Sequence, residues 1–314
     1  MGYPVRLISI EEKDRLMEKY AEKVLYEVKS DIYGCCIKLL TNLKSVKERW
    51  EENFYAMSTS IRSHGRLVVV KDPEESMKVL YDPQSKTAFL LNFTYYGWIK
   101  SLALSVAGDV LEDEHSTYSV HGACLDFNGL GVCLIGASGS GKTTQAYGLL
   151  RSRLVRVVAD DWFFVRFFGD EALAYSSEKN FYIRADLAKT WREFEWLIGK
   201  AEFDEEGRAI VNLRWVIGKG RIMPITTLKN IFILKRDPLD KEFCRRLKPE
   251  EALKTVEENR YFNPHFLVDN EFKKRIRNSF FLNLFKKTNV YLVNTVQSPE
   301  ETQTLIRKIL GLEE

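Results

Sequence analysis

The sequence has little of what marks a secreted or membrane protein. Only five of its 314 residues are cysteines, an odd number that does not make a complete disulfide framework. The opening MGYPVRLISIEEK lacks the basic and then apolar pattern of a secretion leader. The longest apolar runs, such as SLALSVAG and WFFV, fall well short of the roughly 20 residues that span a bilayer. We therefore expect a cytoplasmic protein without a membrane segment, in which the adjacent Cys35 and Cys36 are buried apolar residues rather than a redox pair.

An excess of either charge is also missing. The 47 basic and 44 acidic side chains leave a net charge of +3, so the composition points to neither a nucleic-acid nor an acidic-membrane partner. The hydrophobic content of 45% suffices for one large core or two smaller ones.

No Pro-, Gly- or Ser-rich spacer divides the chain. Residues 9–28 begin with Ser9 and Glu12 at capping-box spacing and carry apolar residues at helical spacing as far as Val28, which predicts an amphipathic helix. Strand-like and helical patterns then follow in mixed order. We predict an N-terminal α+β segment over residues 1–113 and a second domain over residues 114–314; the segment is either a separate domain or a packed extension of one fold.

A glycine-rich motif is the first pattern in the chain that predicts a binding site. GASGSGKTT, residues 136–144, fits G-x-x-x-x-G-K-[ST], with Gly136, Gly141, Lys142 and Thr143 at the required places. GVCLIG before it is typical of a buried strand, and KTTQAYGLLRS after it of a helix. The predicted nucleotide-binding residues are Gly136, Ala137, Ser138, Gly139, Ser140, Gly141, Lys142, Thr143 and Thr144.

Each residue type in this motif has a physical reason. Glycines allow the positive φ values and the close approach that a phosphate-wrapping loop needs. The following helix directs unpaired N–H groups and the positive end of its dipole at the phosphates. The motif predicts that Lys142 reaches the β- and γ-phosphates of ATP and that the Thr143 hydroxyl is a ligand for Mg²⁺.

An acidic pair interrupts the apolar run LVRVVADDWFFVRFF. Asp160 and Asp161 follow a predicted strand that we expect beside the loop strand, which puts them over the phosphates. Successive strand side chains diverge, so we expect the two to divide the work: one holds Mg²⁺ with Thr143, and the other accepts the proton of an incoming hydroxyl. The alternative is a solvated turn.

Three stretches together resemble a known family. SVHG (residues 119–122), GLGVCLIGASGSGKTT and VVADD are similar in order and spacing to the catalytic core of bacterial HPr kinase/phosphorylase, whose fold is related to that of phosphoenolpyruvate carboxykinase. The resemblance implies an α/β fold with a mixed-sheet P-loop core. It also implies that Thr143 and Asp161 hold the metal, that Asp160 is the general base and that His121 is the partner of Asp160.

The similarity thins at FYIRAD. Tyr182 stands where the family has glutamate and Ala185 where it has glycine, so one metal contact is missing and we do not predict the reverse phosphorylase reaction; Glu178 and Asp186 are candidates to replace the glutamate. Arg184 matches the family. It is either a contact for the transferred phosphate or a member of a surface ion pair.

The C-terminal part alternates strand and helix patterns. Ser298, Pro299 and Glu301 mark a helix start and Gly311 its end. We interpret EFKKRIRNSFFLNLFKK as an amphipathic helix with a basic outer face in preference to an RNA-binding surface, and the basic loop with Lys219 and Arg221 as solvated in preference to a substrate contact.

The function predicted from these patterns is an ATP- and Mg²⁺-dependent kinase that transfers the γ-phosphoryl group to a hydroxyl of a protein serine or a small molecule. NKxD and LSGGQ motifs are missing, which argues against a GTPase and a transporter ATPase. The alternatives are a nucleotide-binding regulator without phosphotransfer and an RNA kinase. Nucleic acid is not an expected partner but stays open, and the resemblance implies a homo-oligomer.

Overall fold

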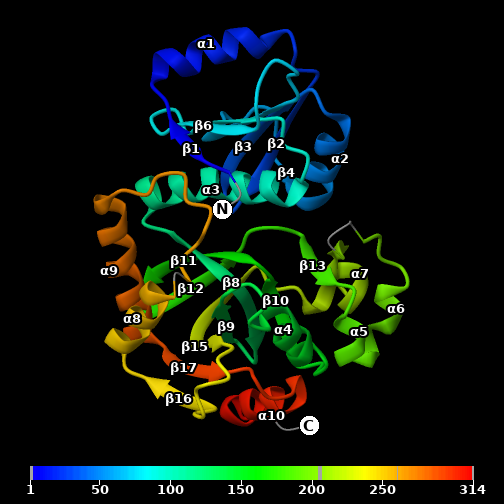
Figure 1. Ribbon diagram of the computed structural model, residues 1–314, viewed down its shortest axis with the longest axis vertical. Coiled ribbons are helices and arrows are strands. Elements are labelled where there is room, and N and C mark those ends of the chain that lie inside the picture. Colours follow the sequence, from blue (N-terminus) through cyan, green and yellow to red (C-terminus); the bar gives the residue numbers. More distant parts are fainter. Residues whose placement is uncertain (1–2, 204–206, 260, 313–314) are drawn as a thin grey trace. The chain divides into compact units, whose positions relative to one another are not determined.

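The computed structural model describes residues 3–203, 207–259 and 261–312 and divides into two compact units. The first consists of residues 1–118, 177–179 and 263–275, and the second of the rest (Figure 1). The chain passes from the first unit to the second between Tyr118 and Ser119 and returns to the first twice. The two returns have no counterpart in the prediction from sequence, which placed a single boundary near residue 114.

The first unit is built on a seven-stranded mixed sheet in the order β1-β6-β7-β5-β3-β2-β4. Its strands are β1 (Val5–Leu7), β2 (Tyr26–Ile32), β3 (Cys35–Thr41), β4 (Tyr55–Ala56), β5 (Gly65–Val70), β6 (Lys78–Asp82) and β7 (Thr87–Leu91). β3, β5 and β7 run parallel and are almost wholly buried, as strands covered on both faces are.

Helices cover both faces of this sheet (Figure 1). α1 (Ile10–Ala21) packs Leu16 and Met17 on one face. α2 (Lys44–Asn53) and α3 (Tyr96–His115) cover the other. The Ser9 cap of α1 is confirmed, since its Oγ accepts from the Glu12 amide. The predicted helix over residues 9–28 was too long: the stretch from Tyr26 forms β2, because its pairing with β3 prevails over the helical spacing.

A buried ion pair holds residues 177–179, where the chain first returns, in the first unit. Glu178 Oε1 lies 3.1 Å from Lys100 Nζ of α3, and Asn53 Nδ2 donates to Glu178 Oε2 at 3.1 Å. The two charged side chains are only 2% and 1% exposed. Glu178 is therefore engaged in the first unit, which accounts for its absence from the candidate site described below.

The second unit is built on an eight-stranded mixed sheet. Its strands are β8 (Tyr118–Phe127), β9 (Leu130–Gly136), β10 (Val155–Ala159), β11 (Trp162–Phe168), β12 (Glu171–Ser176), β15 (Ile225–Lys235), β16 (Cys244–Leu247) and β17 (Asn289–Asn294). β9 lies between antiparallel β8 and parallel β15, and β8 and β15 are also linked through β11 and β12. This is the mixed α/β class predicted from the sequence.

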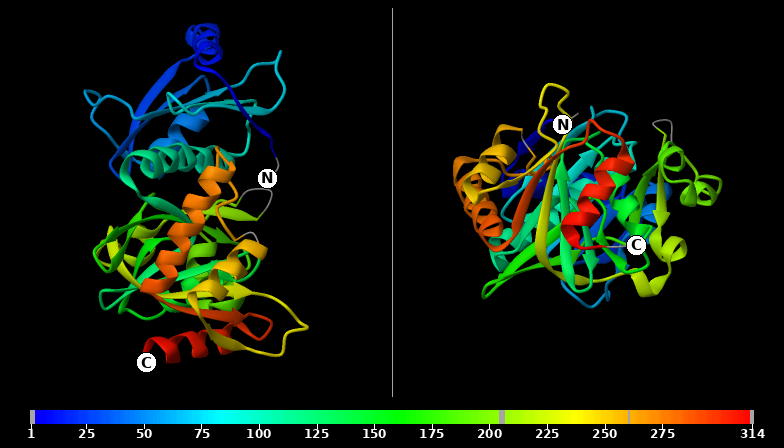
Figure 2. Two further views of the ribbon diagram at one scale, coloured as in Figure 1. Left: turned by 90° about the vertical axis from the view of Figure 1, so that its left-hand side faces the viewer. Right: turned by 90° about the horizontal axis from the view of Figure 1, so that it is seen from below.

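Helices α4 (Lys142–Leu150) and α10 (Pro299–Leu310) pack together in one core with β9, β10, β15 and β17. Ser298 caps α10 in a reciprocal capping box with Glu301, and Gly311 ends it at φ +65°, as the sequence predicted. α8 (Pro249–Glu258) and α9 (Glu271–Lys287) lie close to one another (Figure 2), and Phe262, which follows α8, contacts Phe281 of α9 edge to face at 5.1 Å.

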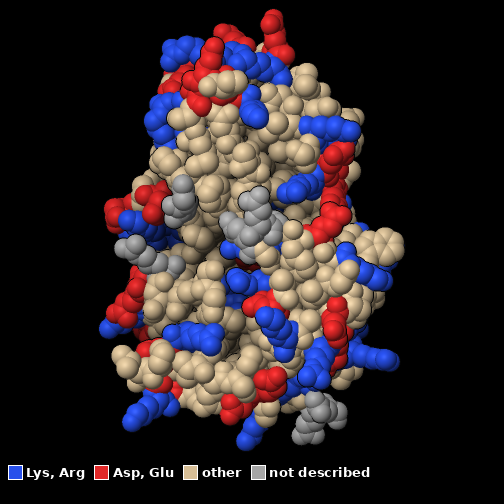
Figure 3. Space-filling view, turned by 45° about the vertical axis from the view of Figure 1, so that its right-hand side comes forward, with Lys and Arg blue, Asp and Glu red and all other residues tan. Residues whose placement is uncertain are grey.

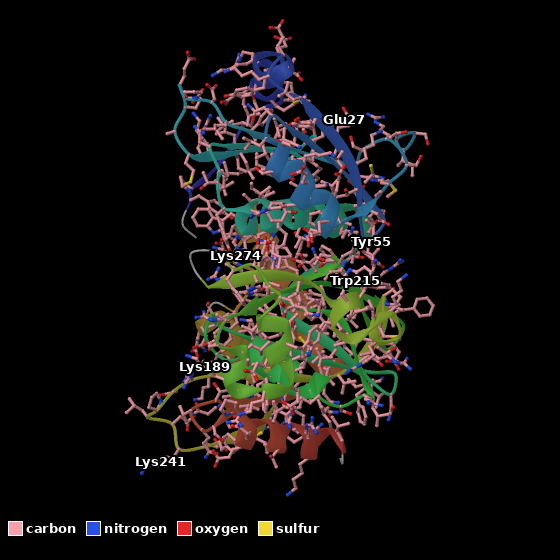
Figure 4. All side chains as sticks on the ribbon, turned by 90° about the vertical axis from the view of Figure 1, so that its right-hand side faces the viewer. Glu27, Tyr55, Lys189, Trp215, Lys241 and Lys274 are labelled. Carbon is pink, nitrogen blue, oxygen red and sulfur yellow. The ribbon has the colours of Figure 1, made fainter. Side chains whose placement is uncertain are left out.

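A hairpin lobe adjoins this core. It contains β13 (Asn180–Arg184), β14 (Arg208–Asn212), the short helices α5 (Leu187–Thr190), α6 (Glu195–Ile198) and α7 (Leu213–Ile217), and the 3₁₀ turns η1 (Arg192–Phe194) and η2 (Lys219–Arg221). Phe181 and Trp191 reach from the lobe into the core around α4. Trp215 of α7 is 84% exposed and is marked with Lys189 of α5 in Figure 4.

The surface agrees with the charge balance. Basic and acidic side chains are interspersed over the face shown in Figure 3, as expected for a net charge of +3. Within the described ranges, no helix is both long and apolar enough to cross a membrane. Cys35 and Cys36 are buried free thiols, as predicted.

Candidate functional site

Three strand ends meet at one edge of the second unit's sheet. In the register, Gly122 of β8 lies opposite Ile135 near the end of β9, and Cys124 of β8 lies opposite Ala159 at the end of β10. β8 runs antiparallel to both, so its start adjoins the ends of the other two. This brings the glycine-rich loop, the acidic pair and His121 to the same edge. One detail of the prediction was wrong: the neighbour of β10 is β8, which separates it from the loop strand.

The loop has the close packing that requires glycine at its first position. A Cβ on Gly136 would lie 2.4 Å from the Leu234 carbonyl oxygen and 2.5 Å from Ser140 Oγ, closer than real Cβ contacts allow. Gly139 and Gly141 have φ values of +82° and +94°, in the region that favours glycine. Ala137, Ser138 and Gly139 are exposed at the tip.

Helix α4 begins directly after the loop. Gly141 is its N-cap residue and no side chain caps the first turn, so the first N–H groups of α4 are directed at the loop. Thr143 and Thr144 lie in this first turn and are partly buried. The Trp191 indole N–H donates to the Thr144 carbonyl at 2.7 Å, which fixes the turn from the side of the hairpin lobe.

Lys142 folds back over the loop. Its Nζ donates to the carbonyl oxygens of Gly136 at 2.7 Å and Ala137 at 3.0 Å. Burial lowers the pKa of this ammonium group, and the nearby carboxylates of Asp161 and Asp160 oppose that shift. Lys142 and the acidic pair therefore lie at the same edge of the sheet, close enough for the two carboxylates to influence the ammonium group.

Ser140 carries a buried polar atom with no hydrogen-bond partner in the described part of the chain. The residue is 4% exposed, and its Oγ is one of the two closest atoms that a Gly136 side chain would meet. Thr295 Oγ1 donates to the Ser140 carbonyl at 2.9 Å, so the backbone at this position is fixed from the loop after β17. A buried hydroxyl beside a helix N-terminus is a fitting donor for an anion.

The acidic pair occupies the bend between β10 and β11. Asp160 is 5% exposed, and its Oδ2 accepts the Tyr182 amide at 2.9 Å. The Asp161 side chain is 33% exposed, and His121 Nε2 lies 3.2 Å from its Oδ1. The expected pairing of His121 with Asp160 is therefore corrected: the observed partner is Asp161. The Gly122 amide donates to the Asp161 carbonyl at 2.8 Å, which brings Asp161 to the strand of His121.

Arg184 lies at the end of β13, opposite Arg208 in the hairpin. It is 61% exposed, and its Nε is 3.5 Å from Asp186 Oδ1. Of the two alternatives for Arg184, the observed contact is the surface ion pair. Tyr182, which stands in place of the family's glutamate, contributes its backbone amide to Asp160.

Two sets of residues that support the loop helix were not recognised as such in the sequence. Arg221 Nη2 donates to the carbonyls of Leu150 at 2.7 Å and Ser152 at 2.6 Å, and its Nε donates to Val155 at 3.0 Å, so it fixes the turn after α4. The prediction that this basic loop is merely solvated was wrong for Arg221, because a guanidinium group pairs several carbonyls at once.

The second set joins α4 to α10. Gln303 Nε2 donates to Gln145 Oε1 at 2.7 Å, and both side chains are buried. Arg307 Nη2 donates to the Gly148 carbonyl at 3.0 Å and its Nε to Gln303 Oε1 at 3.3 Å. Isolated glutamines and arginines carry no sequence signal for the bonds between the two helices, because Gln303 and Arg307 lie more than 150 positions from their partners on α4.

These groups suit a phosphate and a magnesium ion. The loop amides, Lys142 and the Ser140 hydroxyl are donors or cations that suit an anion, while Asp160, Asp161 and the Thr143 hydroxyl offer the oxygen ligands that Mg²⁺ prefers. The close packing around Gly136 and the buried Ser140 Oγ support this fit.

Comparisons with known proteins give a distant similarity in structure. No protein-family model and no curated protein sequence matches this chain. Among solved structures, the chain is similar to the HPr(Ser) kinase/phosphatase from Coxiella burnetii over 61% of this chain and 90% of that one, at 14% identity and a TM-score of 0.35. A TM-score this low supports no functional conclusion, so the function proposed below rests on this chain's own residues.

Proposed function

We propose that the second unit binds ATP with Mg²⁺ and transfers the γ-phosphoryl group to a hydroxyl of a protein serine or a small molecule. One observation carries the proposal: the register of β8 with β9 and β10 brings the glycine-rich loop, the acidic pair and His121 to one edge of the sheet, where α4 begins at Lys142 and His121 contacts Asp161. Groups suited to bind phosphate, to bind a metal ion and to accept a proton thus share one sheet edge, which supports the phosphoryl transfer proposed here.

The residues have distinct parts in this proposal. The loop amides and the Ser140 hydroxyl hold the phosphates, and Lys142 exchanges its bonds to Gly136 and Ala137 for phosphate oxygens. Thr143 and Asp161 hold Mg²⁺, which when bound neutralises charge on the phosphates. Asp160 accepts the proton of the attacking hydroxyl.

The His121 contact supports a second assignment, with the roles of the aspartates exchanged. A histidine beside a carboxylate orients it, and this is useful both for a metal ligand and for a base. Asp161 is also the more exposed of the two and thus the easier for an acceptor to reach. For Arg184 to contact the phosphate, as we also propose, its ion pair with Asp186 has to break.

The test is single-turnover transfer from γ-labelled ATP with Mg²⁺ to cell extract separated into protein, RNA and small-molecule fractions. Label that enters one fraction with the wild type establishes a kinase and names its acceptor class, and label in RNA alone supports the RNA kinase. ATP binding without transfer to any fraction contradicts the kinase and supports a nucleotide-binding regulator.

Two variants separate the roles. Asp160→Asn should abolish transfer while the Kd for ATP stays nearly constant, and Asp161→Asn should raise the Mg²⁺ concentration needed for ATP binding. If instead Asp161→Asn abolishes transfer and Asp160→Asn raises the Mg²⁺ requirement, then Asp161 is the base and Asp160 holds the metal. Asp170→Asn is the matched control, since it removes the same charge from a fully exposed position between β11 and β12 and should leave both measurements unchanged.

A further inference from the structure

A pocket lies at the far end of the loop helix. It is a cavity of about 530 Å³ within the second unit, where α4 ends and α10 and the 3₁₀ turn η1 converge. Its lining residues are Leu150, Arg151, Ser152, Leu154, Glu193, Phe194 and Arg307. α4 spans nine residues, so at a rise of about 1.5 Å per residue the pocket is roughly 13 Å from the glycine-rich loop. It is therefore distinct from the proposed nucleotide site.

The walls combine an apolar surface with convergent charges. Leu150, Leu154 and Phe194 supply the apolar part. Arg151 Nε lies 2.7 Å from Glu193 Oε1. A backbone hydrogen bond lowers the pKa of Glu193 most, and Arg151 and then Arg307 lower it further, so both arginines act on the same region. Two positive groups and one negative group leave the lining with a net positive charge.

Both guanidinium groups are held in place. Arg151 lies over the Trp191 ring, 4.8 Å from its centroid, in a cation–π contact. Arg307 is fixed by its bonds to the Gly148 carbonyl and to Gln303. Because their orientation is set in advance, little side-chain entropy is lost when a ligand engages them.

We propose that this pocket is a second ligand site, for a small organic molecule with one acidic group and an apolar ring. The volume lies within the range of about 300–1,000 Å³ typical of small-molecule sites. The acidic group contacts Arg307 and competes with Glu193 for Arg151, and the ring packs on Leu154 and Phe194. The proposal extends beyond phosphoryl transfer and does not depend on it.

The probes are 1-naphthoate and its neutral counterpart 1-naphthamide, titrated into the full-length chain by calorimetry. The acid should bind about tenfold more tightly than the amide, because a hydrogen bond to a charged partner contributes more than a neutral one. Equal binding of acid and amide, or no saturable binding, contradicts the proposal. Saturating Mg·ATP should leave the affinity unchanged; displacement by ATP means that the acid occupies the glycine-rich loop and likewise overturns the proposal.

Variants locate the site. Arg307→Gln should abolish the preference for the acid, while Lys308→Gln, which removes the same charge from the exposed neighbouring position, should keep it. Glu193→Gln should strengthen acid binding several-fold, since the competing carboxylate is gone. This last variant replaces a side chain that is 52% exposed, so it keeps the test valid if Arg307→Gln fails to fold. An unchanged or weaker affinity in Glu193→Gln, or equal losses in the Arg307 and Lys308 variants, would refute the assignment.

Discussion

His121 Nε2 lies 3.2 Å from Asp161 Oδ1, at the point where the start of β8 meets the end of β10. The imidazole contacts the more exposed aspartate of the acidic pair, while the buried Asp160 receives a backbone amide. The two carboxylates thus have different surroundings, which is the condition for different roles in one reaction.

Replacing His121 should therefore impair the proposed reaction through Asp161. We expect His121→Ala to lower metal affinity or activity about 10–100-fold, the usual effect of removing a group that orients a metal-binding or catalytic side chain. Mn²⁺ binding in the presence of ADP, followed by electron paramagnetic resonance, measures the metal directly. His115→Ala is the control, since His115 is exposed at the end of α3. Unchanged Mn²⁺ affinity and unchanged transfer would show that the contact with Asp161 is incidental.

Gly148 is required by the packing of α4 against α10. A Cβ at this position would lie 2.6 Å from Gln303 Cδ, and Gln303 cannot move away without losing its bonds to Gln145. Gly148→Ala should thus destabilise the protein by about 1–3 kcal/mol, as overpacking does. Urea unfolding measures the change.

The double variant gives the critical comparison. Gln303→Ala removes the obstructing side chain, so Gly148→Ala should cost less free energy in the Gln303→Ala background than in the wild type. Additive effects of the two substitutions would contradict close packing between these residues.

The Lys100–Glu178 pair should respond asymmetrically to substitution. Lys100→Met leaves the Glu178 carboxylate buried without its cation, which should cost about 3–5 kcal/mol. Lys100→Met combined with Glu178→Leu removes both charges and should recover much of that loss. Thermal and urea unfolding of the two variants provide the measurement. A double variant as unstable as Lys100→Met alone would mean that shape, and not charge, governs this position.

The thiols should be unreactive in the folded protein. Burial raises the pKa of Cys35 to about 12 and also raises the pKa values of Cys36 and Cys244. The thiolate is the reactive form, so the native protein should react slowly with a disulfide reagent at about pH 8.5, where half of an ordinary thiol is ionised.

The pH dependence has a definite sign. Because the thiol pKa is higher in the folded than in the unfolded chain, the unfolded chain loses its protons first, and the contribution of Cys35 to stability falls as the pH rises from about 8.5 toward the folded value.

Urea-unfolded protein, in which all five thiols should react, is the reference for the thiol-reactivity measurement. Fast reaction of Cys35 in the native protein would contradict its burial.

The sequence predicted the strand and the helix on either side of the glycine-rich loop. Gly136 ends β9, the glycine-rich loop follows, and Lys142 and Thr143 begin α4, while Ser298 and Gly311 mark the ends of α10 by short-range chemistry. Such patterns are readable because backbone conformation and capping depend on near neighbours.

What the sequence did not predict depends on distant partners. His121 contacts Asp161 and not Asp160 because of the strand register. Arg221 bonds to the end of α4 because the chain passes close to that helix again at η2. The β2 region shows the same effect, since spacing alone favoured a helix and pairing with β3 made it a strand. Pairing between residues far apart in the chain produces no periodic pattern in a single sequence, so it cannot be predicted from spacing.

Because residues 177–179 belong to the first unit, that unit cannot be obtained by truncating the chain after its first stretch. Residues 1–118 contain Lys100 and Asn53, but the carboxylate that both contact belongs to Glu178, beyond β12. A gene fragment that ends at Tyr118 therefore encodes an incomplete unit with a buried cation deprived of its counter-charge. Residues 1–118 alone therefore cannot be transferred as a complete unit; the first unit needs all three of its stretches of chain, two of which interrupt the second unit.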